Sequence, residues 1–361
     1  MKILTIGAAM RDLFLEYKNP ESMTFDVEGF EISYIMLEEG KKIELDAIPH
    51  ATGGGGTNSA CSFLQQGFDV SSFFKVGEDL EGDEIINTLS EQNIDVSSAV
   101  HSKDAPTGRS FIIPSSSGEK VILVYRGANL TIKEDELPRH AIESCDQLYI
   151  TSLSKQSSKL LPIITSLAKQ HKKPVAVNPG SSQLTVNVAT LEESLPTIDI
   201  LIMNCFETSL LMEHLVELDQ APSKKVREEE LPNLLAAPIV HGTIDFTLHH
   251  YFQEVLKRGP KIIVVTNGSD GVYASDGKQI YYHPSLPGKP TSTVGAGDAF
   301  GSTFVGQLLH GKSIEDAIRA GVINSYAVIQ QLDATSGQLT QAELDKKAKE
   351  LDQGLLQTFR A

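Results

Sequence analysis

The stretch Thr291-Ser292-Thr293-Val294-Gly295-Ala296-Gly297-Asp298-Ala299-Phe300 joins a glycine-rich turn to an acidic residue and then to an apolar segment. After Phe300 the apolar residues recur at helical spacing as far as Gly311, which predicts a helix that begins near Gly295, Ala296 and Gly297. The first N–H groups of a helix have no partner within it, and glycines let an anion approach them closely. The stretch therefore predicts an anion-binding helix N-terminus.

Asp298 lies inside this predicted anion site, where a carboxylate repels a bound anion. Two interpretations are open. Asp298 can be an ordinary acid in the first turn of a helix, where the helix dipole favours a negative charge. It can instead be the base that takes a proton from a hydroxyl group attacking a bound phosphate. The stretch alone favours the first interpretation, so the rest of the chain has to decide.

Length and composition are those of a large globular protein. The 361 residues are 40% hydrophobic, which is enough for one large α/β domain or two smaller ones. The formal net charge of −16 argues against non-specific binding to nucleic acid or to an anionic membrane. The three cysteines are far apart and lack metal-ligand spacing, which favours free thiols in a reducing compartment. With no apolar run of membrane-spanning length, we expect a soluble, cytoplasmic protein.

The N-terminal part begins with a buried strand, Lys2–Gly7, and Asp12 follows just past its end. Open α/β sheets bind ligands beyond the carboxyl ends of their strands, so Asp12 is a candidate ligand contact. The run from Gly53 to Ala60 then contains four consecutive glycines before a predicted helix, which is tolerable where a ligand must touch the backbone. Asn58 in this run either caps the helix or binds a substrate hydroxyl, and capping is the commoner role.

Two segments alternate apolar and polar residues and predict hairpins. The first joins Phe30–Met36 to Lys42–Leu45 around Glu39-Gly40, and the second joins Thr107–Pro114 to Lys120–Tyr125. Because a two-stranded ribbon is marginal on its own, we expect the two hairpins to pair into one small sheet. This sheet would form a lid from about residues 13–50 and 104–130.

From Gln147 onward strands and helices alternate regularly, which predicts a parallel sheet covered by helices on both faces. Two of these strands end in polar residues, at Asn178 and Asn204, and both should reach the ligand edge of the sheet. Glu207 is either an acid in a helix first turn or an acid that organises a metal and phosphates. The charged segment 218–260 is predicted to be solvated surface, as are its histidines.

With these parts in order, the chain resembles the ribokinase-like carbohydrate kinases of the PfkB family over residues 2–337. The run Thr293-Val294-Gly295-Ala296-Gly297-Asp298 is similar to the C-terminal signature of that family, and Gly54-Gly55-Gly56-Thr57-Asn58 is similar to its N-terminal one. Weaker matches follow in the right order: Gly7 with Asp12, Val76-Gly77-Glu78-Asp79 with Gly82, Asn204 with Glu207, and Thr266 with Gly268 and Gly271.

The resemblance implies a doubly wound, mostly parallel sheet flanked by helices, with a small β-stranded lid. It also implies that ATP and Mg²⁺ serve phosphoryl transfer to a hydroxymethyl group of a sugar. Carried over by position, the implied roles are a general base (Asp298), an anion hole (Gly295, Ala296, Gly297), substrate contacts (Asp12, Gly54, Gly55, Asn58, Arg109, Arg126), organisation of Mg²⁺ and phosphate (Asn204, Glu207) and nucleotide contacts (Thr266, Gly268, Gly271, Asn324).

The chain departs from the family pattern in four places, one of which is the segment 218–260, which is longer than typical. Ser292 stands where many members have an acid, which puts a monovalent-cation site in doubt, and Thr303 replaces a usual small residue. The glycine motif lacks the lysine of true ribokinases, so ribose is not implied. A nucleoside kinase of the adenosine type is the nearest alternative. A catalytically silent nucleotide-binding regulator is disfavoured because Asp298 and Glu207 are both present.

The expected organisation is a kinase domain over residues 1–340, followed by a C-terminal helical tail over 341–361. The open edges of the lid sheet could meet a second subunit, so we also expect a homodimer joined through the lids, as in many relatives.

Overall fold

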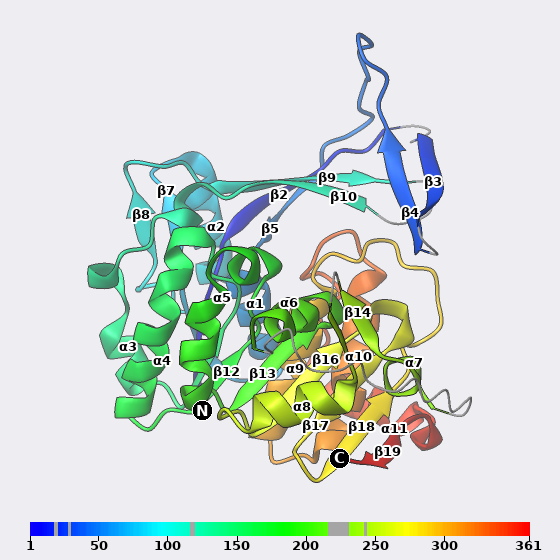
Figure 1. Ribbon diagram of the computed structural model, residues 1–361. Helices are drawn as coiled ribbons and strands as arrows, with labels where there is room; N and C mark the ends of the chain where they lie inside the picture. Colours follow the sequence, from blue (N-terminus) through cyan, green and yellow to red (C-terminus); the bar gives the residue numbers. More distant parts are fainter. Residues whose placement is uncertain (18–20, 28–29, 116–119, 216–230, 242–243) are drawn as a thin grey trace.

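The computed structural model describes residues 1–17, 21–27, 30–115, 120–215, 231–241 and 244–361. Within these residues, the largest sheet has nine strands in the order β19-β18-β17-β16-β13-β12-β11-β1-β6 (Figure 1). The parallel strands are β6 (Asp69–Phe73), β1 (Lys2–Ile6), β11 (Gln147–Ile150), β12 (Val175–Val177), β13 (Ile200–Asn204) and β16 (Ile262–Thr266). Antiparallel strands complete one end: β17 (Val272–Ser275), β18 (Gln279–His283) and β19 (Gln357–Arg360).

Helices cover both faces of this sheet. One face carries α3 (Arg139–Ser144), α4 (Leu161–Gln170), α5 (Ser181–Ser194), α6 (Cys205–Leu215) and α8 (Leu248–Leu256). The other carries α1 (Gly55–Gln65), α2 (Leu80–Glu91), α9 (Ala296–Leu309) and α10 (Ile314–Ile329). The predicted doubly wound α/β fold is therefore confirmed.

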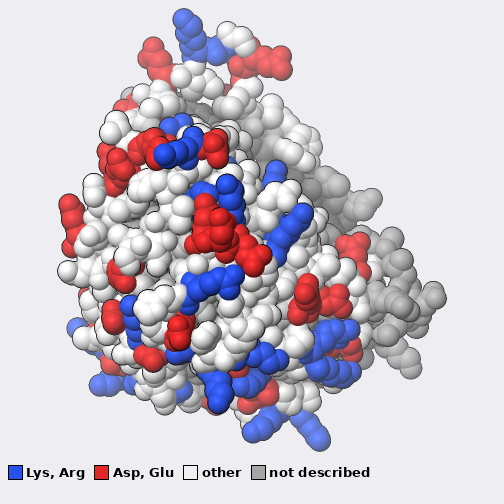
Figure 2. Space-filling model, turned by 90° about the vertical axis from the view of Figure 1, so that its left-hand side faces the viewer, with Lys and Arg blue, Asp and Glu red and all other residues white. Residues whose placement is uncertain are grey.

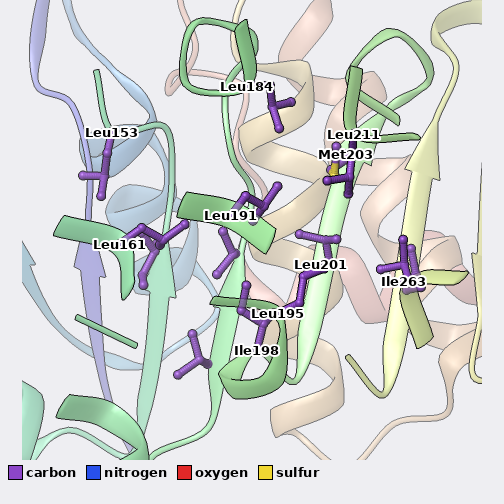
Figure 3. Close-up of a cluster of buried hydrophobic side chains, with 14 of the residues drawn as sticks. Leu153, Leu161, Leu184, Leu191, Leu195, Ile198, Leu201, Met203, Leu211 and Ile263 are labelled. Atoms are coloured by element: carbon purple, nitrogen blue, oxygen red, sulfur yellow. The ribbon is translucent and has the colours of Figure 1, made fainter. Parts of the chain in front are cut away.

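Alternation along each strand divides the apolar side chains between two cores. In β13, Leu201 and Met203 join the core under α4, α5 and α6, whereas Ile202 joins the core under α9. Figure 3 shows Leu191 and Leu211 reaching from the helices toward Leu201 in the first of these cores. The strands need apolar residues on both faces, which is why they read as continuous apolar runs in the sequence.

A smaller sheet, which we call the lid sheet, has the strand order β10-β9-β2-β5. Its strands are β2 (Met10–Phe14), β5 (His50–Gly53), β9 (Gly108–Pro114) and β10 (Lys120–Tyr125), and they run across the top of the molecule in Figure 1. The antiparallel pairing of β9 with β10 confirms the second predicted hairpin, whose residues 116–119 lie outside the described part of the chain. The lid sheet connects directly to the main domain because β2 follows β1 after three residues.

In the first predicted hairpin the strand Phe30–Met36 is confirmed, but its predicted partner, Lys42–Leu45, is wrong. Strand β4 (Phe30–Met36) pairs with the preceding β3 (Glu21–Val27), and residues 42–45 form no strand. An edge-to-face contact between Phe25 and Tyr34, with ring centroids 5.7 Å apart, stabilises this pairing across the ribbon. The β3–β4 ribbon also forms a two-stranded sheet of its own and does not join the lid sheet, so the expected single sheet of two hairpins is wrong as well.

The C-terminal tail is only partly helical. Helix α11 (Gln341–Glu350) lies where the tail was expected, but β19 then pairs with β18 at the edge of the main sheet. Phe359 packs against the apolar core, so residues 357–360 belong to the main domain. The run Gln357–Arg360 contains one apolar residue, Phe359, so the sequence shows no alternation that would predict this strand.

The rest of the described chain adds short elements and a polar surface. Helix α7 (Asn233–Ala236) and the ribbon of β14 (Ile239–His241) and β15 (Ile244–Phe246) belong to the predicted surface segment 218–260, of which residues 218–230 and 242–243 lie outside the described residues. Acidic and basic side chains are interspersed on the face drawn in Figure 2. None of the helices in the described residues is both long and apolar enough to cross a bilayer.

Candidate active site

The glycine turn of the opening stretch forms the N-terminus of α9. Gly295 precedes the helix with φ of 77°, and a Cβ at this position would overlap the Cβ of Ala334. The first α-helical hydrogen bond runs from the N–H of Ala299 to the carbonyl of Gly295, at 2.9 Å. The amides of Ala296, Gly297 and Asp298 precede this bond, so they are the unpaired helix-start donors that favour an anion.

A second helix N-terminus meets the first one. Gly54 precedes α1 with φ of 102°, and Asn58 lies inside the helix, four residues beyond Gly54. The Nδ2 group of Asn58 donates a hydrogen bond of 2.8 Å to Oδ2 of Asp298. Asn58 is therefore not the N-cap of α1, and the commoner of its two predicted roles is wrong. Its side chain points instead to the predicted base.

Between these helix starts and the sheet lies a cleft of about 280 Å³. It is lined by Gly55, Thr151, Ser152, Asn178, Pro179, Gly180, Ile202, Met203, Asn204, Glu207, Thr266, Thr293, Gly295, Ala296, Gly297 and Asp298. The residues from the sheet lie at or just beyond the carboxyl ends of β11, β12, β13 and β16, where open α/β sheets bind their ligands. Its charged lining residues are two acids, Asp298 and Glu207.

The carboxylate of Asp298 is held in a polar but desolvated position. Burial raises its pKa above the ordinary value of 3.8, and the hydrogen bond from Asn58 opposes that rise. The absence of a side chain on Gly55 leaves room beside the carboxylate, because a Cβ there would stand 3.2 Å from Oδ1 of Asp298. A base with a raised pKa that opens onto a cleft is typical of catalytic sites.

Asp12 is a buried acid close to the half-buried Asp298. It lies in β2 with 5% of its surface exposed, and the missing side chain of Gly53 leaves room for its carboxylate. Burial raises the pKa of Asp12 to about 6, a hydrogen bond from Ser110 lowers it, and the charge of Asp298 adds to the rise. Asp12 does not line the cleft itself but lies at its lid side.

Asn204 and Glu207 form a reciprocal capping box at the start of α6. Oδ1 of Asn204 accepts from the N–H of Glu207 at 2.8 Å, and Oε2 of Glu207 accepts from the N–H of Asn204 at 2.9 Å. Ser181 donates to the other carboxylate oxygen at 3.1 Å. Burial raises the pKa of Glu207, and these hydrogen bonds oppose the rise. Glu207 is thus a helix-start acid, as one of the two interpretations had it, and it also lines the cleft.

The predicted nucleotide residues separate into two groups. Thr266 lines the cleft, and Gly268 and Gly271 follow it in the turn between β16 and β17, with φ of 53° and 120°. A Cβ at Gly271 would overlap the carbonyl of His283, so this glycine is required by the turn itself. Asn324 is fully buried, and its amide bonds to Thr303 and to the N–H of Leu339. The structure gives Asn324 a packing role and no place in the cleft.

The two predicted substrate arginines also differ. Arg109 donates to Glu81 at the start of α2, at 2.6 Å, which gives it a structural partner outside the cleft. Arg126 is half-buried and donates to the hydroxyl of Ser154 at 3.1 Å, just beyond the end of β11. Burial lowers the pKa of Arg126, and no ion pair of its guanidinium occurs within the described residues. Of the two arginines, Arg126 is therefore the one whose guanidinium group could bind a substrate.

The cleft contains residues that the sequence interpretation missed. Thr151 and Ser152 follow β11, and Thr293 belongs to the opening stretch itself. A polar pair after a buried strand is the same signal that marked Asn178 and Asn204, so Thr151 and Ser152 could have been found. Lys120, at the start of β10, contacts the hydroxyl of Thr293 and so brings the lid sheet to the cleft. No sequence signal connects residues so far apart in the chain.

Metal ligands are sparse in this region. The described residues contain no group of three or more His, Cys, Asp and Glu side chains that could hold a metal ion. Mg²⁺, however, usually keeps several waters and binds proteins through one or two carboxylates together with substrate phosphates. The single carboxylate of Glu207 on the cleft wall fits a contact through water and does not fit a cage of protein ligands.

The fold is of the doubly wound α/β class, and its cleft combines a half-buried acid with an anion-binding helix N-terminus. The chain belongs to the pfkB family of carbohydrate kinases, whose model matches residues 3–341. It is 26% identical over 301 residues to a ribokinase of Staphylococcus aureus, covering 81% of this chain and 87% of that one. It is also 26% identical over 281 residues to a 5-dehydro-2-deoxygluconokinase of Clostridium tetani, covering 74% and 75%.

A solved structure shares the whole architecture. The ribokinase of Arabidopsis thaliana, complexed with ribose and ATP, superposes with a TM-score of 0.71 at 19% identity, covering 96% of this chain and 98% of that one. The similarity extends over both the main sheet and the lid region, because almost the full length of each chain takes part.

We predict different effects for two glycines of the α9 turn. Gly295→Ala should lower the free energy of unfolding by about 1–3 kcal/mol, because alanine is strained at positive φ and its Cβ overlaps Ala334. Gly297→Ala is the matched control, since a Cβ at Gly297 meets no atom within 4 Å. Urea unfolding measures both. Equal stability of the two variants would contradict this account of the turn.

Proposed function

We propose that this protein transfers the γ-phosphoryl group of ATP to a hydroxymethyl group of a small sugar. The observation that carries the proposal is the position of Asp298, a carboxylate with a raised pKa directly beside the unpaired amides at the start of α9. A base next to an anion site is what in-line phosphoryl transfer to a hydroxyl requires.

In the proposed reaction Asp298 accepts the proton of the attacking hydroxyl. The hydroxyl oxygen forms the new bond to phosphorus while the bond to the ADP oxygen breaks, so the proton moves to the carboxylate and ADP leaves. The amides of Ala296 and Gly297 at the helix start, together with the amide of Gly295 just before it, donate to the oxygens of the phosphoryl group during the transfer. Fixed donors of this kind stabilise developing charge at little cost in reorganisation.

Glu207 and Asn204 are proposed to organise the metal at the phosphates. When bound, Mg²⁺ would neutralise phosphate charge. The carboxylate of Glu207 is fixed by the backbone of Asn204 and the hydroxyl of Ser181, and its remaining lone pairs can accept from a metal-bound water. A monovalent-cation requirement is not part of the proposal, because Ser292 supplies no carboxylate.

The sugar and the nucleotide are proposed to occupy opposite ends of the cleft. Asp12, Gly54, Gly55 and Asn58 would contact sugar hydroxyls on the lid side, with Arg126 as an additional donor. Thr266, Gly268 and Gly271 would line the nucleotide at the other end. The contact of Lys120 with Thr293 supports the idea that the lid sheet closes over the transferring group and excludes water.

The experiment that tests this proposal is an ATP-consumption assay with a panel of sugars and nucleosides. Turnover of a sugar, with a phosphorylated product detected by mass spectrometry, would support it. Turnover of a nucleoside alone would identify the nucleoside kinase alternative, which uses the same base and anion hole. Nucleotide binding without turnover of any acceptor in the panel would favour a silent regulator.

Asp298→Asn should lower kcat by about a hundredfold or more, the usual scale for the loss of a general base, with nucleotide affinity retained. Only the ionised carboxylate accepts a proton, and burial raises its pKa above 3.8. The kcat/KM of the wild type should therefore fall as the pH drops through this raised pKa, and the residual rate of the variant should lack this acid limb. Near-normal turnover of the variant would show that Asp298 is not the catalytic base.

Glu207→Gln should raise the Mg²⁺ concentration that gives half the maximal rate, because a neutral amide is a poorer acceptor for a metal-bound water. Glutamine also completes a capping box, so α6 should keep its stability. Rates measured across a Mg²⁺ titration at saturating ATP provide the comparison. An unchanged Mg²⁺ requirement would leave Glu207 with its helix-start role alone.

We also propose a homodimer joined through the lids. All five residues from Val121 to Tyr125 in the edge strand β10 are at least 39% exposed, so both faces of this apolar strand are open to solvent. The neighbouring ribbon adds exposed Met23, Phe25, Tyr34 and Met36. A contiguous apolar surface on an edge strand marks an interaction site, and a second copy offers the same surface in return.

Leu123→Glu should weaken this dimer by at least about tenfold in dissociation constant, because a carboxylate in an apolar interface loses its hydration. Val240→Glu is the matched control, since Val240 is also exposed but lies on β14, outside the lid sheet. Sedimentation velocity over a range of concentrations compares the three proteins. A wild type that is monomeric at all concentrations would contradict the proposed homodimer.

A further inference from the structure

The two carboxylate oxygens of Asp298 have different surroundings. Oδ2 accepts the hydrogen bond from Nδ2 of Asn58, at 2.8 Å. Oδ1 faces the backbone of Gly55, where a Cβ would stand 3.2 Å away. Gly55 lines the cleft and carries no side chain, so Oδ1 is the oxygen that a substrate in the cleft can approach.

Asn58 is itself held firmly by the backbone around it. Its N–H donates to the carbonyl of Gly54 at 2.9 Å, and its carbonyl accepts from Nε2 of Gln338 at 2.9 Å. Nε2 of Gln338 also donates to the carbonyl of Ala334, the residue that packs against Gly295. One loop thus supports both the asparagine and the turn that precedes the base.

The orientation of the Asn58 amide follows from its neighbour. An ionised carboxylate only accepts hydrogen bonds, so the NH₂ group and not the oxygen of the amide must face Asp298. Asn58 is 3% exposed, and its Oδ1 has no hydrogen-bond partner among the described residues. A buried polar atom without a partner carries a free-energy cost, so the amide is held in place for its contact with Asp298 and not for a complete set of bonds.

We propose that Asn58 is the positioning residue of the base: it restrains Oδ2 of Asp298, keeps the carboxylate ionised, and leaves Oδ1 to accept the substrate proton. This assignment rests on the proposed kinase activity. It is a role in addition to the sugar contact proposed above, because this effect of the asparagine passes through the charge of Asp298.

The physical basis is a balance between burial and one hydrogen bond. Burial favours the neutral carboxylic acid, which cannot act as a base, whereas a donor to the ionised form favours the carboxylate. Among the influences on the pKa of Asp298, the bond from Asn58 is the one that lowers it. The other titratable groups close to Asp298 are Asp12 and Tyr149, and the charge of Asp298 raises the pKa of each. Removal of the bond from Asn58 would leave the effect of burial unopposed.

The test is the pH dependence of kcat/KM in Asn58→Leu, which keeps the approximate size of the side chain and removes its donor. A hydrogen bond to a charged group is worth enough to change a rate by about ten- to a hundredfold. We expect a loss of this size at pH 6 that diminishes as the pH rises, because the acid limb moves to higher pH.

Asn58→Asp gives a second variant of nearly unchanged shape in case the leucine variant does not fold. It replaces the donor by a like charge, so the two carboxyl groups would share a proton and the acid limb should again lie at higher pH than in the wild type. Asn129→Leu is the matched control, because it removes another buried amide, one that bonds to Ala9 and not to Asp298. Any loss there should be the same factor at every pH.

The outcomes separate the inference from the function on which it rests. A wild type that phosphorylates no acceptor would contradict the proposed kinase activity itself. An active wild type whose position-58 variants lose the same factor at all pH values would show that Asn58 is only a substrate contact or a packing residue, and would overturn the inference. An unchanged kcat/KM in folded variants would overturn it as well.

Discussion

Desolvation of one carboxylate, that of the half-buried Asp298, is the constraint on which the rest of the site depends. A carboxylate in a desolvated cleft favours its neutral form, and in this position it also opposes the charge of a phosphate. The surrounding chain offsets both effects. The amides at the start of α9 provide positive dipoles, and the amide of Asn58 donates to the charged oxygen.

Close approach of two helix N-termini makes this arrangement possible. After β1 the chain passes through strands of the lid sheet and α1 to β6, which lies on one side of β1. Strand β11 comes later in the chain and lies on the other side of β1. The turn before α1 therefore lies near the point where the strand order reverses, and α9 packs beside α1 on the same face of the sheet. Glycines at 54, 55 and 295 are needed because the backbones of these turns lie against Ala8, Thr151 and Ala334. Helix geometry alone would not bring Asn58 to Asp298.

Much of the fold could be predicted from local patterns. The strands of the main sheet are apolar on both faces because helices cover both sides, and continuous runs such as Ile262–Thr266 show this directly. The glycines of the two signatures predicted the helix starts, since few other residues adopt positive φ or admit a close backbone contact. Local patterns were less successful at predicting which strands pair with each other. The alternation in Lys42–Leu45 looked like a strand, but β4 found its partner in β3, which alternation alone cannot reveal.

The sequence by itself determined the class of fold, the anion-binding turn and the acid that follows it, because each depends on residues within a few positions of one another. Only the tertiary structure decided which partners distant residues take. In the folded chain Asn58 donates to Asp298 and does not cap its own helix. Arg109 forms an ion pair with Glu81. The buried amide of Asn324 bonds to Thr303 and Leu339. It also added β19 to the main sheet. The physical reason is the same in each case: a polar side chain or a free strand edge bonds to whatever the packed chain brings within about 3 Å, and sequence spacing does not encode that distance.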